Sequence, residues 1–492
     1  MYEKIISGGD HKRKYDLILV NAPLKNYDKS PKLNKFTLPV LGLGYIATYC
    51  EKKGWNIGVI DCEGLGLGIT KVAKILNELM PRWVGFNLLA PTYTLSRSIA
   101  EKLHPDMKII LGGHQAKAMP RDIILDQGFP KIDAMVLGES ELRVEEILRN
   151  EKNKEFLPDV YYRSEFGDFL GGKIDRTGKG YSYWTAPDVN GLPFVNRQFL
   201  TQDPFRTEEG KIEANIVGSR GCPYDCSFCG AAKSANPDIS IRTRNPLNIL
   251  EEMFSLSNEL QVDSFRFVDD LFLANPRFMK KCLPEFVNKE VGNKFVWDAT
   301  GRINILAKAS DDLFLLMKKA GCREVALGIE SGSARVLKYI DKHVSPDMTI
   351  KAVQNLTKHG IHVKGYVIMG FPTETESELK ETYNHIHLLW KKAKNNSGNF
   401  RCSVFEFRPY PGTPEWNRIM KTGRFTKEQL LNYSHVDMTD EGVDQKMLDR
   451  DEFNFSVNLQ FGEAPIKMVR DLIADLTRKQ KDIWMPKGER VN

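Results

Sequence analysis

The chain of 492 residues lacks any long hydrophobic run, and no stretch approaches the ~18 apolar residues that span a membrane as a helix. It also lacks a strong excess of one charge, because 70 Lys and Arg are interspersed with 64 Asp and Glu, for a formal net charge of +6. The first absence argues against membrane insertion, and the second argues against nucleic acid as a main partner. Residues 1–16 are charged and contain no apolar signal-peptide core, so the expected location is the cytoplasm.

Cysteine is scarce, yet three of the eight cysteines, Cys222, Cys226 and Cys229, lie within eight residues. Thiolates hold zinc or iron–sulfur clusters, and zinc needs a fourth Cys or His in paired spacing. The next Cys or His downstream of the three is the distant Cys282. Disulfides are disfavoured because the group contains three cysteines, an odd number. The C-x3-C-x2-C spacing therefore favours a four-iron cluster with one iron left open, with zinc or structural thiols as alternatives.

Residues 16–149 alternate between short apolar runs and helical segments. The expected strands are 16–21, 56–60, 83–87, 107–111 and 132–136, and the expected helices are 41–53, 69–79, 92–103, 123–127 and 140–149. This alternation predicts a doubly wound, Rossmann-like parallel sheet, which binds ligands beyond the carboxyl ends of its strands. A dinucleotide is disfavoured, because Asn21-Ala22-Pro23 stands where a G-x-G-x-x-G turn should follow the first strand.

Residues 211–415 repeat a strand–helix unit six times, which predicts a partial (β/α)6 barrel with its active groups at the carboxyl strand ends. The expected strands are 212–217, 262–268, 294–299, 323–329, 362–369 and 401–407. We therefore divide this α/β chain into a first sheet domain (1–150), a connector (151–210), the partial barrel (211–415) and a helical C-terminal region (416–492). In the connector we expect a strand at 159–163 and a hairpin return at 171–174, and in the last region helices at 427–433 and 465–483. The remaining downstream cysteines are expected to be buried free thiols: Cys282, Cys322 and Cys402.

The stretch Gly221–Gly230, with Phe228 before its last cysteine, resembles the signature of the radical S-adenosylmethionine (SAM) superfamily. The resemblance implies a [4Fe-4S] cluster on the three cysteines, whose open iron binds SAM. It also implies SAM contacts at the barrel strand ends, where Gly328–Ser333 and Gly365–Glu374 resemble the SAM and adenine segments. The predicted SAM contacts are Phe228, Asp269, Asp270, Arg302, Glu330, Ser331 and Gly370. For the aspartates a helix cap or a supporting pair is the alternative, and for Arg302 a structural salt bridge is equally open.

The first domain resembles the cobalamin-binding module of one radical SAM class, through residues 38–47, Gly54, Asp61, 111–114 and 137–141. The predicted cobalamin contacts are Pro39, Thr92, Gly112, Gly113, His114, Gly138 and Glu139. The D-x-H-x-x-G loop that supplies a cobalt ligand in many cobalamin proteins is missing here. We therefore expect cobalamin without a histidine ligand, and interpret His114 as a loop histidine, then as a contact to the corrin or its tail, and last as a cobalt ligand. A domain without cobalamin stays the alternative.

The combined resemblance implies methylation of an unactivated sp3 carbon, or of phosphorus, in a small-molecule biosynthetic intermediate. Two SAM would be used, 5′-deoxyadenosine and S-adenosylhomocysteine released, and electrons supplied by a donor such as flavodoxin or ferredoxin. The alternatives are a radical rearrangement, cyclisation or dehydration without methyl transfer, and a non-catalytic cobalamin or redox-sensing module. Transfer RNA methylthiolation is disfavoured, because only Cys50 and Cys62 stand in the first domain, where its families carry a second cysteine trio.

Overall fold

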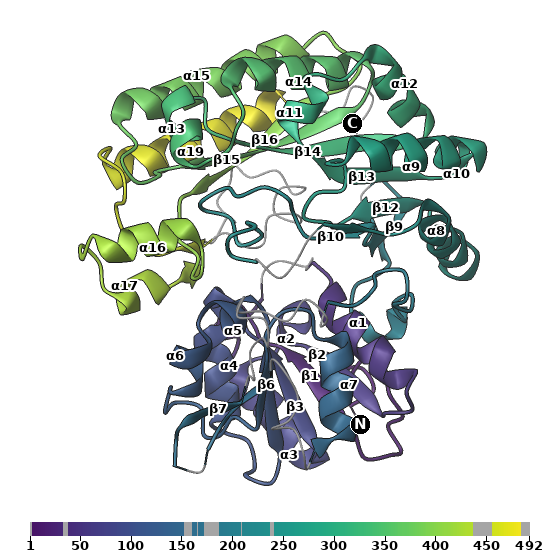
Figure 1. Cartoon of the computed structure of the whole chain (residues 1–492), viewed down its shortest axis with the longest axis vertical. Coiled ribbons are helices and arrows are strands. Elements are labelled where there is room, and N and C mark those ends of the chain that lie inside the picture. The colour runs from purple at the N-terminus through teal and green to yellow at the C-terminus, as the bar shows by residue number, and fades with distance from the viewer. Residues whose placement is uncertain are drawn as a thin grey trace.

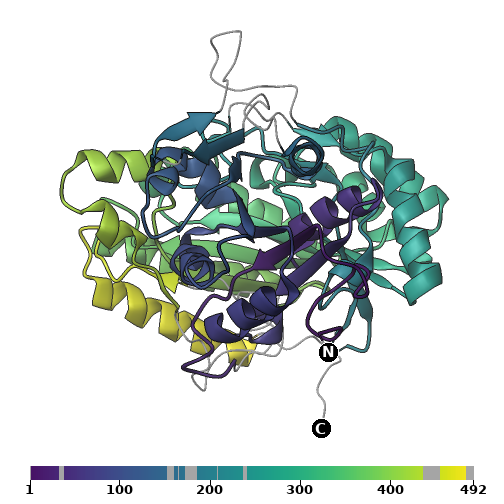
Figure 2. The same cartoon turned by 90° about the horizontal axis from the view of Figure 1, so that it is seen from below.

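A computed structural model of the protein describes residues 2–32, 38–151, 160–164, 166–171, 186–207, 209–236, 241–435 and 455–483. Two α/β domains stack along the long axis, with the N-terminal domain below the partial barrel in Figure 1. The view from below shows the N-terminal domain in front of the barrel sheet (Figure 2). The predicted fold class, a doubly wound sheet followed by a partial barrel and a helical C-terminal region, is confirmed.

The N-terminal sheet has the strand order β2-β1-β3-β4-β5-β6-β7. Its five parallel strands are β1 (Leu17–Asn21), β2 (Ile57–Asp61), β3 (Trp83–Asn87), β4 (Lys108–Gly112) and β5 (Ala134–Val136). Strands β1 and β2 are buried at every residue, as expected for near-continuous apolar runs covered on both faces of a parallel sheet. Because β1 lies between β2 and β3, the winding direction reverses there, which opens a crevice at the carboxyl ends of these strands.

Helices cover both faces of this sheet. They are α1 (Leu41–Glu51), α2 (Cys62–Leu65), α3 (Ile69–Leu79), α4 (Tyr93–Ala100), α5 (His114–Ala118), α6 (Pro120–Ile124) and α7 (Glu141–Arg149). One face packs against α1 and α7, through residues such as Leu43 and Ile147. The other packs against α3 and α4, through residues such as Leu76 and Ile99.

The first sheet extends past its parallel strands into the connector. The predicted strand at 159–163 is β6 (Val160–Arg163), which pairs antiparallel with β5, and its return strand is β7 (Phe169–Gly171). The return strand thus begins two residues before the predicted start at Gly171. Residues 172–174 of that prediction lie outside the described residues. Arg163 fixes β6, because its guanidinium donates to the carbonyl of Phe129 at 2.6 Å and to that of Ile124.

The second sheet has the order β16-β15-β14-β13-β12-β9-β8, with six parallel strands and the short antiparallel β8 (Phe205–Arg206) at one edge. The parallel strands are β9 (Ile212–Ile216), β12 (Ser264–Phe267), β13 (Val296–Gly301), β14 (Cys322–Glu330), β15 (His362–Met369) and β16 (Phe400–Glu406). The helices between them are α8 (Pro246–Leu260), α9 (Pro276–Asn288), α10 (Val291–Lys294), α11 (Ile303–Leu306), α12 (Asp311–Lys319), α13 (Ala334–Tyr339), α14 (Pro346–Lys358) and α15 (Glu376–Ala393). In Figure 1 helices α11, α14 and α15 lie on the side of this sheet away from the N-terminal domain.

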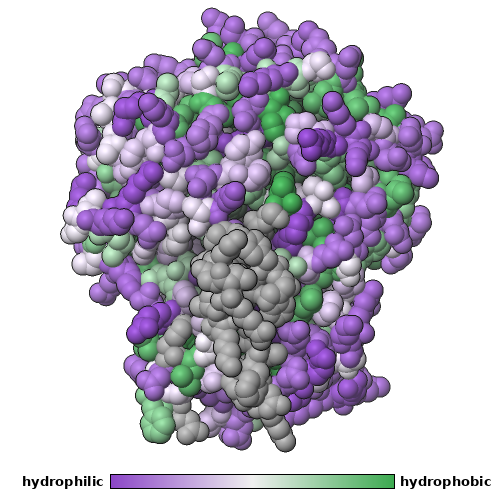
Figure 3. Space-filling view, viewed as in Figure 1, coloured by the Kyte–Doolittle hydropathy of each residue, from purple (hydrophilic) through white to green (hydrophobic). Residues whose placement is uncertain are grey.

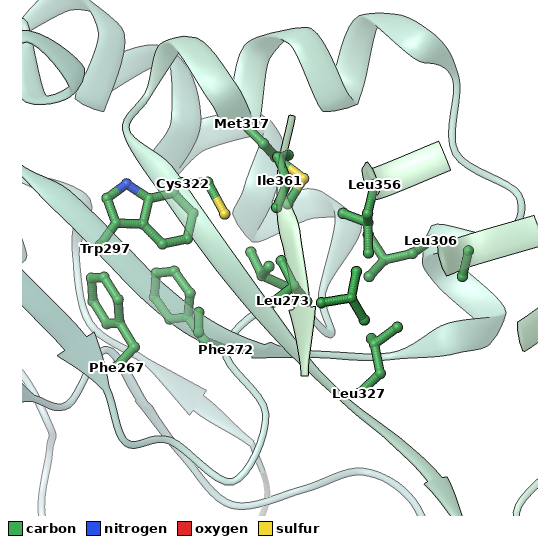
Figure 4. Close-up of a cluster of buried hydrophobic side chains, with 14 of the residues drawn as sticks. Phe267, Phe272, Leu273, Trp297, Leu306, Met317, Cys322, Leu327, Leu356 and Ile361 are labelled. Atoms are coloured by element: carbon green, nitrogen blue, oxygen red, sulfur yellow. The ribbon is translucent and has the colours of Figure 1, made fainter. Parts of the chain in front are cut away.

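Strand residues of the barrel alternate between two environments. One set packs under the helices in a large apolar core, where Phe267, Phe272, Trp297 and Cys322 lie together (Figure 4). The other set is charged and faces the inside of the partial barrel, where Arg323 bridges Asp298 at 2.6 Å and Glu213 at 2.8 Å. The three downstream cysteines are all buried in the apolar core, as expected for structural thiols: Cys282, Cys322 and Cys402.

The C-terminal region packs against the β16 edge of the barrel sheet and against α15. It contains α16 (Pro414–Lys421), α17 (Lys427–Leu431), β17 (Ser434–His435), β18 (Phe455–Ser456) and α19 (Ile466–Ile483). Helix α19 packs on the edge strand β16, where the Gln480 amide oxygen accepts the Cys402 N–H at 2.5 Å. Helix α17 reaches the N-terminal domain through the ion pair of Lys427 with Asp122. No helix among the described residues is long and apolar enough to cross a membrane, and Figure 3 shows a face dominated by hydrophilic side chains.

Candidate functional site

A cavity of about 460 Å³ lies between the two domains. Its lower wall is formed by the carboxyl ends of β3, β4 and β5, through Asn87, Gly113 and Gly138. Its upper wall contains Cys222 and Asp270 from the barrel domain. The predicted strand-end segments of the first domain and the predicted cluster loop therefore face each other across one cavity.

A narrow slot of about 50 Å³ continues from this cavity into the N-terminal domain, between the sheet and helices α1 and α7. Glycines open it: Gly85 and Gly112 line the slot, and a Cβ on Gly112 would meet only atoms at 3.8 and 3.9 Å. The slot shares five residues with the cavity, namely Leu43, Ile46, Asn87, Gly113 and Ser140. A flat body in the cavity with a tail in the slot is the shape that these two spaces accept.

The cluster loop, residues 221–230, is anchored from two directions. The Ser227 N–H donates to the Ile340 carbonyl at 3.0 Å, and the Glu415 N–H donates to the Ser227 carbonyl at 2.9 Å. The Cys229 Sγ accepts the Ala231 N–H at 3.4 Å. These bonds hold the backbone beside Cys226 and Cys229 in place.

Two buried cations stand behind the thiols. The Arg302 Nη1 donates to the Cys226 Sγ at 3.6 Å, its guanidinium stacks 3.9 Å from the Tyr224 ring centroid, and it also donates to the Lys342 carbonyl. The Lys342 ammonium lies 5.9 Å from the Phe228 ring centroid. Lys342 forms an ion pair with the Glu330 carboxylate, whereas Arg302 forms no ion pair with a carboxylate of the described residues, and its Nε has no hydrogen-bond partner there.

The thiols are suited to a cluster rather than to a single ion. Burial raises the pKa of Cys229 to about 12, so metal ligation must supply the energy to deprotonate it. Within the described residues no three Cys, His, Asp or Glu side chains converge as ligands of one metal ion. A four-iron cluster does not need such convergence, because each thiolate binds a different iron.

The two aspartates after β12 have different surroundings. Asp269 is buried at the edge of the cavity, and its carboxylate accepts the N–H groups of Gly218, at 3.0 Å, and of Ser219. Burial raises the pKa of Asp269 to about 7, against the opposing effect of these bonds. Asp270 is exposed to the cavity. Asp269 thus supports the segment that enters the cluster loop, as one alternative anticipated, and Asp270 is the carboxylate available to a ligand.

The segment after β14 is occupied by internal contacts. Glu330 has a φ of +64° at a shift in the β14–β15 register, and its carboxylate forms a buried ion pair with Lys342 at 2.5 Å. The Ser331 hydroxyl lies 3.0 Å from that of Thr382. Ser333 caps α13 by accepting the Val336 N–H, which is the capping role weighed for it.

The predicted adenine segment is shaped by a buried glutamate and by the C-terminal region. The Glu374 carboxylate accepts the N–H groups of Gly370 at 2.6 Å and Phe371 at 3.1 Å. The Glu374 carbonyl in turn accepts the N–H groups of Glu463, at 2.9 Å, and Ala464, at 3.0 Å. The chain leading into α19 therefore holds this loop, which gives the C-terminal region a role that its sequence did not indicate.

The predicted cobalamin contacts separate into cavity residues and supports. Gly113 has a φ of +96°, and a Cβ there would lie 2.5 Å from the Asn87 Oδ1, so its glycine is needed for the backbone itself. Thr92 is buried, and its hydroxyl bonds the Leu89 backbone. Pro39 lies just before the lining residue Val40, and its carbonyl accepts the Leu41 N–H at 2.8 Å.

His114 begins α5 at the cavity wall. Its ring is exposed to the cavity, yet both domains surround it, and this enclosure lowers its pKa. Asp270 faces it from the barrel domain, and its negative charge opposes that shift. His114 thus lies where it can contact a ligand bound in the cavity, which is one of the roles predicted for it.

Glu139 joins the domains rather than facing the cavity alone. Its carboxylate accepts from Arg220 at 2.9 Å and from Arg242, and Arg220 also donates to Glu141 at 2.7 Å. The Arg220 guanidinium lies 4.8 Å from the Tyr45 ring centroid. Because Arg220 is two residues before Cys222, these ion pairs tie the cluster loop directly to the N-terminal domain.

Arg220, Arg242, Lys342 and Glu374 escaped the sequence analysis. Arg220 adjoins the cysteine signature and Glu374 is the last residue of the adenine segment, so motif position was an available signal for both. Arg242, in the short strand β11 (Arg242–Thr243), and Lys342, in a loop, belong to no motif, and only the folded chain brings them to the site.

Comparison with known proteins agrees with this site. The model of the radical SAM superfamily matches residues 216–386, and that of the B12 binding domain matches residues 34–148. The chain therefore contains a radical SAM domain preceded by a B12-binding domain. These domains imply a [4Fe-4S] cluster, SAM and cobalamin as cofactors.

Three relatives and one solved structure illustrate the likeness. A Pyrococcus horikoshii protein described as an uncharacterized methyltransferase is 27% identical over 82% of this chain and 83% of its own length. Cytidylyl-2-hydroxyethylphosphonate methyltransferase of Streptomyces wedmorensis is 25% identical over 86% and 85%. Anaerobic magnesium-protoporphyrin IX monomethyl ester cyclase of Cereibacter sphaeroides is 24% identical over 84% and 65%. The radical SAM methyltransferase TsrM of Kitasatospora setae, solved with cobalamin and a [4Fe-4S] cluster, has the same fold, with a TM-score of 0.65 and 18% identity over 96% and 90%.

Proposed function

We propose that this protein is a cobalamin-dependent radical SAM methyltransferase that acts on an unactivated sp3 carbon, or on phosphorus, of a small-molecule biosynthetic intermediate. The observation that carries the proposal is the cavity shared by the cluster loop and the strand ends of the B12-binding domain. The methyltransferase-named relatives are matched over 83% and 85% of their own lengths and the cyclase relative over only 65%, which favours this reaction over ring closure.

The chain's residues would divide the work by position. Cys222, Cys226 and Cys229 would hold the cluster, and the backbone at Gly370 would receive the adenine of SAM. Gly42 fits a large flat ligand, because a Cβ there would meet nothing within 4 Å. When bound, the cluster and SAM supply a 5′-deoxyadenosyl radical, and cobalamin supplies the methyl group to be transferred.

Asp270 and His114 would meet the substrate or the cofactors from opposite walls of the cavity. The enclosing domains would keep water away from the radical, which otherwise reacts with solvent or protein. Glu330 and Ser331 would shape the SAM pocket together with their partners Lys342 and Thr382.

An external electron donor of the flavodoxin or ferredoxin kind would reduce the cluster. We also place the reaction in the cytoplasm, because its reducing conditions preserve thiolate-held clusters. The apparent absence of a strong charge excess, with a net charge of +6, leaves a small molecule as the favoured substrate over nucleic acid.

The test is anaerobic purification and reconstitution with iron, sulfide and hydroxocobalamin, followed by incubation with SAM and dithionite. We expect both 5′-deoxyadenosine and S-adenosylhomocysteine by mass spectrometry, and loss of 5′-deoxyadenosine in Cys226→Ala. Formation of 5′-deoxyadenosine without S-adenosylhomocysteine would sink methyl transfer and leave a rearrangement or cyclisation. Formation of neither, with cluster and cobalamin both bound, would point to a non-catalytic module.

A further inference from the structure

A second hollow, a groove of about 670 Å³, lies on the outer rim of the barrel between the first turns of α8 and α9. It is distinct from the cavity between the domains, with which it shares no lining residue. The lining residues that matter here are Thr243, Leu247, Arg277, Lys280, Lys281 and Glu285.

The groove is positively charged. The side chains of Arg277, Lys280 and Lys281 are exposed and form no ion pair within the described residues, while Glu285 is the one carboxylate of the lining. Helices α8 and α9, of 15 and 13 residues, both direct their amino-terminal ends toward it, which adds partial positive charge. Leu247 is 54% exposed at the same place and offers an apolar contact within the basic rim.

The groove is connected to the cluster loop by a short hairpin. Thr243 of β11 (Arg242–Thr243) pairs with Ser219 of β10 (Ser219–Arg220), and β10 runs directly into Gly221 and Cys222. From Thr243 across the hairpin to Cys222 the backbone path is about 15 Å at most. The groove is thus linked to the cluster loop through Thr243 and its paired strand, while its own lining is separate from that of the cavity.

We propose that this groove is the docking surface of an acidic electron-carrier protein, of the flavodoxin or ferredoxin class, which reduces the cluster. The inference rests on the proposed function, since each SAM cleavage consumes one electron. That electron leaves the carrier, which is oxidised, passes to the cluster, and breaks the C5′–S bond of SAM to give methionine and the 5′-deoxyadenosyl radical. A small basic rim around one apolar contact is suited to a weak, charge-steered redox encounter.

Charge reversal in the groove tests this. The variant Lys280→Glu/Lys281→Glu is compared with Lys351→Glu/Lys380→Glu, which makes the same charge change at exposed positions on α14 and α15. In stopped-flow measurements of the reconstituted holoenzyme, we expect the groove variant to slow cluster reduction by a reduced bacterial flavodoxin about tenfold at low salt. The difference should shrink as salt rises. The control variant should keep the wild-type rate, and dithionite should drive 5′-deoxyadenosine formation equally in all three proteins.

The outcomes separate the two proposals. An unchanged flavodoxin rate in the groove variant, with dithionite-driven SAM cleavage intact, overturns the docking surface and leaves the proposed function standing. Equal slowing in both variants overturns it too, because the effect would then follow net charge alone. If wild-type protein accepts electrons from dithionite but from neither reduced flavodoxin nor reduced ferredoxin, the inference also fails. Absence of SAM cleavage with dithionite in the wild type is instead a failure of the proposed function.

Discussion

The Nη1 nitrogen of Arg302 lies 3.6 Å from the Sγ atom of Cys226. The guanidinium is buried, and the ring of Tyr224 holds it in place by stacking. A fixed positive charge and an N–H donor beside a cluster thiolate stabilise the reduced cluster more than the oxidised one, because reduction adds a negative charge.

Replacement of Arg302 by Gln is therefore expected to lower the reduction potential of the cluster. We expect a shift of about 50 mV, close to the tenfold change in equilibrium that 59 mV represents for one electron. The reduction potential of Arg302→Lys should fall between those of the wild type and Arg302→Gln, since lysine keeps the charge but not the planar donors. Redox titration followed by electron paramagnetic resonance of the reduced cluster measures the shift. Arg478→Gln, in an exposed ion pair of α19, is the control, and equal potentials in all proteins would contradict the prediction.

The ion pairs of Glu139 predict a separable effect on cobalamin. Glu139→Gln weakens the contacts to Arg220 and Arg242 without touching a thiol, so the two cavity walls lose part of their alignment. We expect hydroxocobalamin to bind about tenfold more weakly, which matches the ~1.4 kcal/mol of one partly buried charged bond, with iron content unchanged. Glu146 lies on α7, which follows Glu139, and forms no interdomain ion pair among the described residues, so Glu146→Gln should bind hydroxocobalamin normally. Loss of iron in Glu139→Gln would contradict the prediction that this change affects cobalamin binding without affecting the cluster.

The slot beside Gly112 predicts a size limit. Gly112→Ala should be tolerated, because its Cβ would meet only atoms at 3.8 and 3.9 Å. Gly112→Leu would fill a slot of about 50 Å³ and exclude the tail of a ligand. For Gly112→Leu we expect at least a tenfold loss of cobalamin affinity, which corresponds to ~1.4 kcal/mol or more of binding free energy. For Gly112→Ala we expect less than a twofold loss. Spectroscopic titration of both with hydroxocobalamin decides this, and circular dichroism checks that both fold.

Both sheets could be predicted because the runs that build them are local. Buried parallel strands such as Leu17–Asn21 are apolar up to their last residue, and the helices between them follow a helical period, so no distant partner is needed to recognise them. The antiparallel β6 and β7 were recognised as a hairpin but not as part of the first sheet, because that depends on pairing with β5. Their short runs carry no signal of the strand they join.

The site, like the fold, has local features that the sequence predicts and long-range contacts that it does not. The spacing of Cys222, Cys226 and Cys229 and the glycine-rich strand ends are local features, and the fold brings both to one cavity. Which groups reach that cavity depends on partners far apart in the chain. Ser331 meets Thr382 across 51 residues, and Arg220 meets Glu139 across 81, so neither pairing is written in a motif.

Glu374 gives a prediction of the pH dependence of stability. Its side chain is fully buried, two backbone N–H groups bond one oxygen, and the other oxygen has no partner among the described residues. Burial, the largest influence, raises the pKa of Glu374 from 4.5 to about 7. The folded protein therefore binds a proton here that the unfolded chain has already released, between pH 4.5 and about 7.

An acid with a raised pKa in the folded state stabilises the fold fully below its unfolded pKa, and that contribution is lost as the pH rises through the folded pKa. We expect the unfolding free energy of the wild type to fall relative to Glu374→Gln between pH 5 and 8, by about 3 kcal/mol at most. The Gln amide does not titrate, and its oxygen can still accept the N–H groups of Gly370 and Phe371. Anaerobic guanidinium unfolding at several pH values measures the difference, with the exposed Glu376→Gln as the control for a lost carboxylate. A difference that stays constant with pH would mean that Glu374 is ionised in the folded protein, and that the adenine loop is held by a charged carboxylate.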